Sequence, residues 1–108
     1  MYPAKGPSPS VEYLSAGSLS AAAEPAVFCF SVVAAAEPGA MPRVLEFFAK
    51  RNLVPLRWIS QLTGPGEREL SMDIQVAGLT PEVGHYIARC IDQLHDVRLV
   101  LTSEKAAA

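Results

Sequence analysis

Every second residue is apolar in two segments of the chain, which is the pattern of a strand with one face buried. In residues 27–33, Phe28, Phe30 and Val32 share one face, and in residues 70–76 the shared apolar positions are Leu70, Met72, Ile74 and Val76. The first segment is also rich in β-branched and aromatic residues, which favours a strand. Both segments are therefore predicted to be strands with one face in the core.

Two other segments repeat apolar residues every three to four positions, as a helix lying on a core does. The apolar stripe of the first consists of Met41, Val44, Leu45 and Phe48, and that of the second of Val83, Ile87, Cys90, Ile91 and Leu94. The first helix is expected to begin near Ala40 and to end at Arg51 and Asn52. Thr80 and Pro81 mark the start of the second, because threonine caps a first turn and proline fits its first position.

The remaining apolar segments, residues 54–62 and 97–102, are predicted to be strands as well. Residues 63–67 form a turn rich in glycine and proline before residues 70–76, which indicates an antiparallel hairpin. The order strand, helix, strand, strand, helix, strand predicts an α+β fold. Its expected form is a ferredoxin-like βαββαβ sandwich, a four-stranded antiparallel sheet with two helices on one face.

Such a sheet would leave the face opposite the helices without a cover from the same chain. The apolar candidates for this open face are Cys29, Val33, Val100 and Trp58. A small domain buries its own surface inefficiently, so a second copy would be a natural cover for this face or for a sheet edge. We therefore expect a homodimer.

The two ends of the chain lack these patterns. Residues 1–25 are interrupted by proline, glycine and serine and carry one basic residue, Lys5, which predicts a flexible tail rather than an export signal. Residues 105–108, Lys-Ala-Ala-Ala, are expected to be disordered. A single domain, residues 26–104, remains between them.

Charge and composition exclude several classes of function. The net charge is −2 and the pI about 5.6, which provides no basic surface for nucleic acid. No apolar run reaches the roughly 20 residues of a membrane helix, so no membrane partner is expected. The two cysteines, Cys29 and Cys90, are far apart and lack C-x-x-C spacing, so no metal site or cofactor is predicted. Thiols kept reduced predict a cytoplasmic protein.

No catalytic constellation is apparent in the sequence. A triad needs a nucleophile, a base and an orienting acid, whereas both histidines, His85 and His95, lie on or next to the second predicted helix. His85 is expected in solvent and His95 at the end of the helix, where the dipole favours a charged imidazole. Cys29 and Cys90 are expected to be buried core thiols. The prediction is a protein that is not an enzyme.

Residues 36–45, Ala-Glu-Pro-Gly-Ala-Met-Pro-Arg-Val-Leu, join the first strand to the first helix through a Pro-Gly turn. Together with the order of the elements, this turn resembles the signature of the ACT domain family, small regulatory domains that sense amino acids. The resemblance covers residues 27–103. Residues 57–61 and 80–94 look most like the short regulatory subunits of acetohydroxyacid synthase, which implies a larger catalytic enzyme subunit as a partner.

The Pro-Gly turn is the candidate binding site. Glycine at position 39 lets another backbone approach closely, and the N–H groups at the start of a helix suit a carboxylate. The resemblance implies that this loop meets a neighbouring subunit and that an amino acid binds between the two, which would modulate amino-acid metabolism. The binding residues that it implies are Glu37, Pro38, Gly39, Ala40, Met41, Val54 and Pro55.

The sequence departs from the family pattern at this site. Ala36 stands where family members that bind amino acids often have Asn or Asp, and Val54 and Pro55 stand where a polar contact is common. Pro42 removes one N–H from the helix start, and Glu37 is the one side chain left for the ammonium of a ligand. Two functions therefore stay open: a regulatory module that binds an amino acid or similar small molecule, and a ligand-free assembly domain that docks on a larger catalytic subunit.

Overall fold

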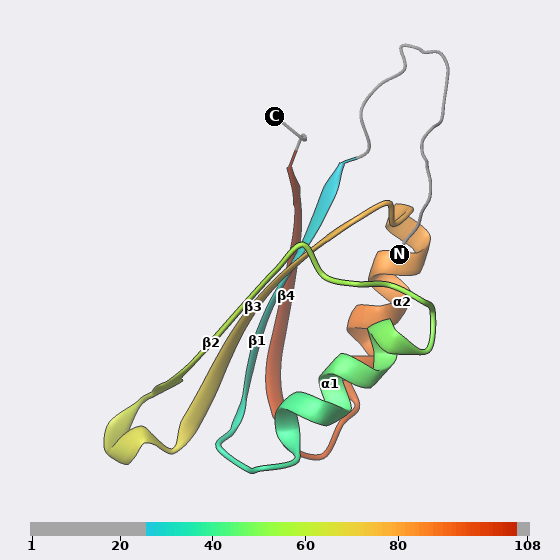
Figure 1. Cartoon of the computed structure of the whole chain (residues 1–108). Helices are drawn as coiled ribbons and strands as arrows, with labels where there is room; N and C mark the ends of the chain where they lie inside the picture. The colour runs from blue at the N-terminus through green and yellow to red at the C-terminus, as the bar shows by residue number, and fades with distance from the viewer. Residues whose placement is uncertain (1–25, 106–108) are drawn as a thin grey trace, which may run out of the picture.

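The computed structural model describes residues 26–105, which form four strands and two α-helices in the predicted order (Figure 1). These are β1 (Val27–Ala35), α1 (Ala40–Ala49), β2 (Arg57–Thr63), β3 (Glu69–Ala77), α2 (Pro81–Asp92) and β4 (Val97–Lys105), with a short 3₁₀ helix, η1 (Pro65–Glu67), before β3. The predicted α+β sandwich is thereby confirmed. The expected tail, residues 1–25, lies outside the described residues, as do residues 106–108. Lys105, the first residue of the segment expected to be disordered, ends β4.

The strands form one sheet in the order β2-β3-β1-β4, and every neighbouring pair is antiparallel. β1 and β3 therefore occupy the middle of the sheet. Their register pairs apolar positions with one another, for example Phe30 with Ile74 and Val32 with Met72. Because paired residues of antiparallel strands point to the same face, the two alternating patterns in the sequence produce one apolar face.

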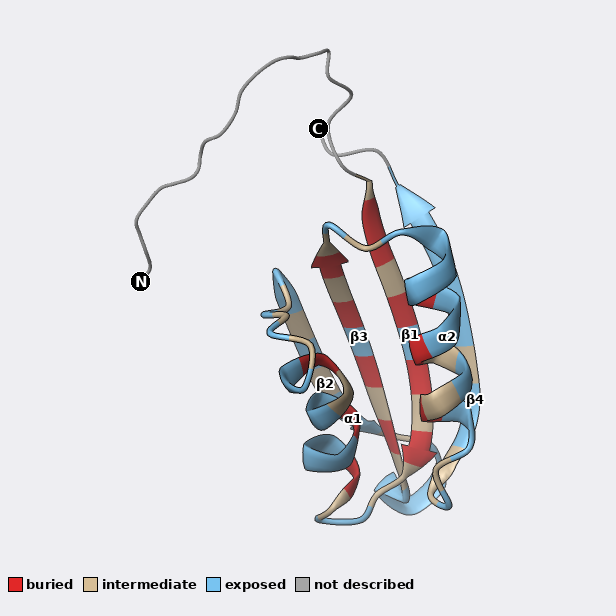
Figure 2. Cartoon of the chain, turned by 90° about the vertical axis from the view of Figure 1, so that its right-hand side faces the viewer, coloured by how far each residue is buried: buried red, intermediate tan, exposed pale blue. Residues whose placement is uncertain are grey.

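Both helices cover that apolar face (Figure 2). The buried core consists of Phe28, Phe30, Val32, Ala34, Ala40, Val44, Phe48, Leu70, Met72, Ile74, Val76, Ile87 and Ile91. The ring of Phe30 lies 5.1 Å from that of Phe28 and 5.3 Å from that of Phe48, centre to centre, so aromatic packing joins α1 to the middle of the sheet. Neither helix within residues 26–105 is long and apolar enough to cross a membrane.

The buried stripe of α1 is narrower than predicted. Val44 and Phe48 are buried, but Met41 and Leu45 are 41% and 44% exposed, and Ala40 is buried beside the first two. The prediction was wrong for Met41 and Leu45, because the face of α1 that packs on the core is centred on Ala40, Val44 and Phe48. That row instead faces the segment that leads into β2.

α2 packs more closely on the sheet than its stripe predicts. Its buried positions are Gly84, Ile87 and Ile91, whereas Val83, expected in the stripe, is 37% exposed. A Cβ placed on Gly84 would lie 2.5 Å from the Cε2 and Cζ atoms of Phe28, so this position has no room for a side chain. The missing side chain lets the helix backbone rest on the aromatic ring.

The open face of the sheet differs from the prediction at Val100 and Trp58. The pairing of Val100 with β1 and of Trp58 with β3 places both on the helix side, where they pack against the core. The register assigns Cys29, Val33, Ile59, Leu99 and Leu101 to the open face. Both edge strands carry apolar residues on each face, so alternation alone could not decide which face is covered.

Gly84→Ala is expected to destabilise the domain by about 1–3 kcal/mol, because the new methyl group would overpack against the Phe28 ring. In an unobstructed helix interior, a change from glycine to alanine stabilises the protein by up to about 1 kcal/mol. Overpacking and helix propensity therefore predict opposite signs for the change in the free energy of unfolding. Urea denaturation of the parent and of the Gly84→Ala variant measures the difference in their free energies of unfolding.

A variant without the aromatic ring provides the matched control. In a Phe28→Leu background, the further change Gly84→Ala should cost clearly less than it does in the parent, because the obstructing ring is gone. A Gly84→Ala protein as stable as the parent would contradict the contact between α2 and β1.

Candidate ligand site at the loop between β1 and α1

The loop that joins β1 to α1 is held by backbone hydrogen bonds to two other parts of the chain. The Ala35 N–H donates to the Asp96 carbonyl over 2.8 Å, and the Ala36 N–H donates to the Arg68 carbonyl over 2.9 Å. The Glu37 N–H turns back to the Ala35 carbonyl, also over 2.8 Å. Because Asp96 precedes β4 and Arg68 precedes β3, the position of the loop is set by the ends of its two neighbouring strands.

Few backbone donors are left at the start of α1. The Ala40 N–H bonds the Glu37 carbonyl over 3.0 Å, the Arg43 N–H bonds the Gly39 carbonyl over 3.2 Å, and Pro42 has no N–H. No side chain of the described residues caps this end. The Met41 N–H is therefore the donor in the first turn that remains for an outside acceptor such as a carboxylate.

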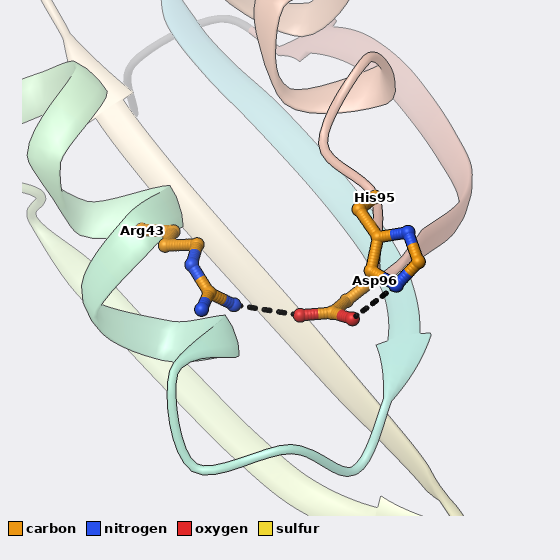
Figure 3. Close-up of polar contacts among 3 residues, drawn as sticks. All are labelled: Arg43, His95 and Asp96. Atoms are coloured by element: carbon orange, nitrogen blue, oxygen red, sulfur yellow. Dashed lines mark hydrogen bonds and ion pairs between the residues drawn. The ribbon is translucent and has the colours of Figure 1, made fainter.

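A hollow of about 720 Å³ with charged walls lies on one side of the loop. It is lined by Glu37, Pro38, Gly39, Arg43, Leu94, His95 and Asp96. Figure 3 shows its polar centre, where an Arg43 Nη donates to an Asp96 Oδ over 2.7 Å and the His95 Nε2 lies 3.7 Å from the other Asp96 oxygen. We call this the polar hollow.

The charged groups of the polar hollow differ in their exposure. The Asp96 side chain is 13% exposed, whereas those of Arg43 and His95 are 56% and 98% exposed. A carboxylate so covered by protein needs a cation beside it, and Arg43 supplies one from the first turn of α1. The pair thus ties the start of α1 to the segment between α2 and β4.

The guanidinium of Arg43 also explains the glycine in the loop. A Cβ on Gly39 would lie 2.9 Å from the Cζ and both Nη atoms of Arg43. The bare backbone at position 39 thus leaves space for the guanidinium to reach Asp96. The predicted close approach at Gly39 is made by a side chain of the same molecule.

A second hollow, of about 550 Å³, lies on the other side of Pro38 and is almost entirely apolar. Its lining residues are Pro38, Met41, Pro42, Leu45, Pro55 and Trp58. The one polar atom of the Trp58 ring, Nε1, donates to Ser60 Oγ over 2.6 Å, which leaves the ring surface for apolar contact. We call this the apolar hollow.

Most of the residues predicted for the site border one of these hollows, and two do not. Glu37, Pro38 and Gly39 line the polar hollow, whereas Met41 and Pro55 join Pro38 around the apolar one. Of the others, Ala40 is only 2% exposed and belongs to the core, and Val54 is 85% exposed and lines neither hollow.

The sequence analysis missed Arg43, Asp96, Leu45 and Trp58. Arg43 lies one helical turn after Gly39, and the predicted topology already places the start of the last strand beside the end of the first. These two signals together could have indicated the ion pair. Leu45 was assigned to the core, and the interrupted pattern of residues 54–62 gave Trp58 no clear face.

The other candidate residues lie apart from this loop or differ from their expected burial. His85 is exposed, as expected, and the centre of its ring lies 5.4 Å from the centre of the Phe28 ring. Cys29 and Cys90 are free thiols and half-buried rather than buried, because Cys29 lies on the open face and Cys90 at the margin of the α2 stripe. Within residues 26–105, no group of three histidine, cysteine or acidic side chains is placed to hold a metal ion.

Comparison with known proteins finds similar structures and no similar sequences. No protein-family model matches the chain, and no curated protein is significantly similar to it. The C-terminal domain of the MgtC protein from Mycobacterium tuberculosis has a TM-score of 0.62 at 11% identity, over 77% of this chain and 90% of that one. The ACT domain from GTP pyrophosphokinase of Chlorobium tepidum has a TM-score of 0.60 at 6% identity, over 71% and 96%.

A third similar structure is that of a regulatory subunit. The regulatory subunit of aspartate kinase from Thermus thermophilus, in its ligand-free form, has a TM-score of 0.57 at 13% identity, over 73% of this chain and 50% of that one. At such identities the likeness concerns the fold, which is that of an ACT domain. The predicted resemblance to this fold is confirmed. The nearer resemblance to the regulatory subunits of acetohydroxyacid synthase stays a prediction.

A double-mutant cycle with Arg43→Gln and Asp96→Asn is expected to give a coupling energy of about 1 kcal/mol or more, because Asp96 is largely covered by protein. Urea denaturation of the four proteins measures it. The control is the pair Arg98–Glu69, whose Nη and Oε atoms lie 2.8 Å apart but whose Glu69 side chain is 34% exposed. This pair should couple by about 0.5 kcal/mol or less. Stronger coupling in the control pair would contradict the structural role of Asp96.

Proposed function

We propose that this protein is a non-catalytic regulatory module that binds an amino acid or a similar small molecule beside the loop between β1 and α1. The observation that carries the proposal is the pair of hollows that meet at Pro38, one with charged walls and one apolar. A free amino acid with an apolar side chain has the same two parts. The similarity in fold to ACT domains and to a regulatory subunit of aspartate kinase supports the same class of function.

The residues around Pro38 divide between the two parts of such a ligand. The Met41 N–H and the half-exposed Arg43 guanidinium are available to a carboxylate, and Glu37 is an exposed acceptor for an ammonium group. Met41, Leu45 and the Trp58 ring would cover an apolar side chain. The proposed effector is therefore an amino acid with an apolar side chain.

A second copy of the chain would complete the site. Both hollows are open to solvent, and the apolar one lies beside residues of unusually high exposure for their type, Val54 at 85% and Leu56 at 63%. Covering these side chains in a homodimer would remove apolar surface from water and enclose the ligand. Ligand and partner copy would then stabilise each other, and a catalytic subunit bound to the dimer could respond to the effector.

A ligand-free assembly domain is the alternative function. The exposed apolar residues of the open face, Ile59, Leu99 and Leu101, favour it, because a larger catalytic subunit could dock on that face without any small molecule. The free thiols Cys29 and Cys90 agree with a cytoplasmic location for either function.

Thermal unfolding of the full chain against a panel of the twenty amino acids tests the proposal, after light scattering has established its size. An apolar amino acid present at about 100 times its Kd should stabilise the protein by about 2.7 kcal/mol, a rise of several degrees in Tm. Charged and strongly polar amino acids should give no shift.

Two variants connect such a shift to the site. Leu45→Gln, in the apolar hollow, and Gly39→Val, which displaces the Arg43 guanidinium, should each abolish it. Leu62→Gln is the matched control. Leu62 is exposed to a similar extent as Leu45, 52% against 44%, but it lines neither hollow. A stable dimer without any shift across the panel would reject amino-acid binding and favour the assembly domain.

A further inference from the structure

Three cationic side chains lie on aromatic rings at the end of α1 farthest from the ligand site. The Lys50 Nζ lies 5.1 Å from the centre of the Phe47 ring. The guanidinium carbons of Arg51 and Arg89 lie 5.3 and 5.8 Å from the centre of one and the same ring, that of Tyr86. We call Phe47, Lys50, Arg51, Tyr86 and Arg89 the cationic cluster. It joins the end of α1 to the middle of α2.

The backbone at the end of α1 fixes Arg51. Asn52 adopts a left-handed conformation (φ 57°), and the Leu53 N–H reaches back to the Phe48 carbonyl over 3.0 Å, which closes the helix. One Arg51 Nη donates to the Phe47 carbonyl over 3.1 Å. The guanidinium is therefore held between a carbonyl and the Tyr86 ring, and little of its freedom would be lost when it binds an anion.

The cations of this cluster have no acidic partner in the part of the chain that the structure describes. Arg43 and Arg98 each form an ion pair with a carboxylate of the same molecule, but within residues 26–105 no carboxylate lies at ion-pair distance from Lys50, Arg51 or Arg89. Two guanidinium groups near one ring repel each other, and an anion bound beside them would offset this repulsion. Tyr86 lies beside these groups and is 48% exposed, so aromatic surface is also open to solvent here.

We propose that the cationic cluster binds an acidic segment of a partner protein, in which aspartate or glutamate residues alternate with apolar ones. Arg51 and Arg89 would form paired hydrogen bonds with the carboxylates, as guanidinium groups do best. The rings of Phe47 and Tyr86 would cover the apolar side chains between them. The partner surface is thus defined by its chemistry, a carboxylate next to an apolar group.

The surroundings of the cluster favour a polypeptide over a nucleic acid. The chain as a whole carries a net charge of −2, and the same two helices expose Glu46, Glu82 and Asp92 to solvent. A long polyanion would meet these carboxylates as soon as it extended beyond the cluster. A short acidic segment would not.

Fluorescence anisotropy with the full chain tests this inference. The probe is a short fluorescein-labelled peptide of alternating glutamate and leucine, with the corresponding glutamine peptide as its neutral counterpart. The unchanged protein should bind the glutamate peptide and not the glutamine peptide. The affinity should fall as salt is added, because exposed ion pairs are screened.

Two double variants with the same change in charge locate the binding. Arg51→Gln with Arg89→Gln should weaken binding about tenfold or more, which is the loss expected for two charge-assisted contacts. Arg57→Gln with Arg68→Gln is the matched control: both residues are exposed, neither has an ion-pair partner within residues 26–105, and both lie outside the cluster. The control should bind as the parent does. Tyr86→Leu should weaken binding and Tyr86→Phe should not, because phenylalanine keeps the ring on which the guanidinium groups lie.

Four outcomes would overturn the inference. They are no binding of the glutamate peptide, equal binding of the glutamine peptide, equal losses in the two double variants, and tighter binding of a DNA duplex than of the peptide through Arg51 and Arg89. Circular dichroism of each variant confirms that it is folded. The cluster shares no residue with the two hollows, so this experiment and the amino-acid panel can fail separately.

Discussion

The position of β1 in the middle of the sheet is the constraint on which the rest of this structure depends. β1 is hydrogen-bonded along both edges, to β3 and to β4, and one of its faces is buried under the helices. A strand bound on both edges and covered on one face cannot shift its register without exposing its apolar side chains. Its end is therefore a fixed point, and the loop that follows is bonded to the carbonyls of Asp96 and Arg68. Both hollows are arranged around that loop.

The elements of the fold could be predicted because they depend on local patterns. The apolar residues at every second position of β1 and β3 identified the buried faces of these strands correctly. Thr80 caps α2 as expected, and its hydroxyl accepts from the Val83 N–H over 3.2 Å. The edge strands and the margins of the helices could not be predicted in this way. Trp58 and Val100 face the helices only because of the registers of β2 and β4, which depend on pairing with distant residues. The exposure of Val83 follows from the close contact between Gly84 and Phe28, which no periodicity reports.

The candidate site was predictable in position but not in chemistry. The Pro-Gly turn marked the loop, and Glu37, Pro38, Gly39, Met41 and Pro55 border its hollows. The charges that define the polar hollow come from the contact of two segments far apart in the chain, which bring Arg43 to Asp96 (Figure 3). The predicted topology places the start of β4 beside the end of β1, but the structure is needed to show that the Arg43 side chain of α1 reaches Asp96 there. The charged side chains beside the loop are thus supplied by α1 and by the segment before β4.

α1 lies between the candidate ligand site and the cationic cluster, and an arginine near each end of this helix contacts α2 or the segment after it. Arg43 at its start bonds Asp96, and Arg51 just beyond its end packs on Tyr86. A ten-residue helix is only about 15 Å long. A ligand carboxylate that bound Arg43 would compete with Asp96 for the guanidinium at the start of this helix. An acidic partner that bound Arg51 would do so just beyond its other end. The two proposed sites are therefore placed at opposite ends of one short helix.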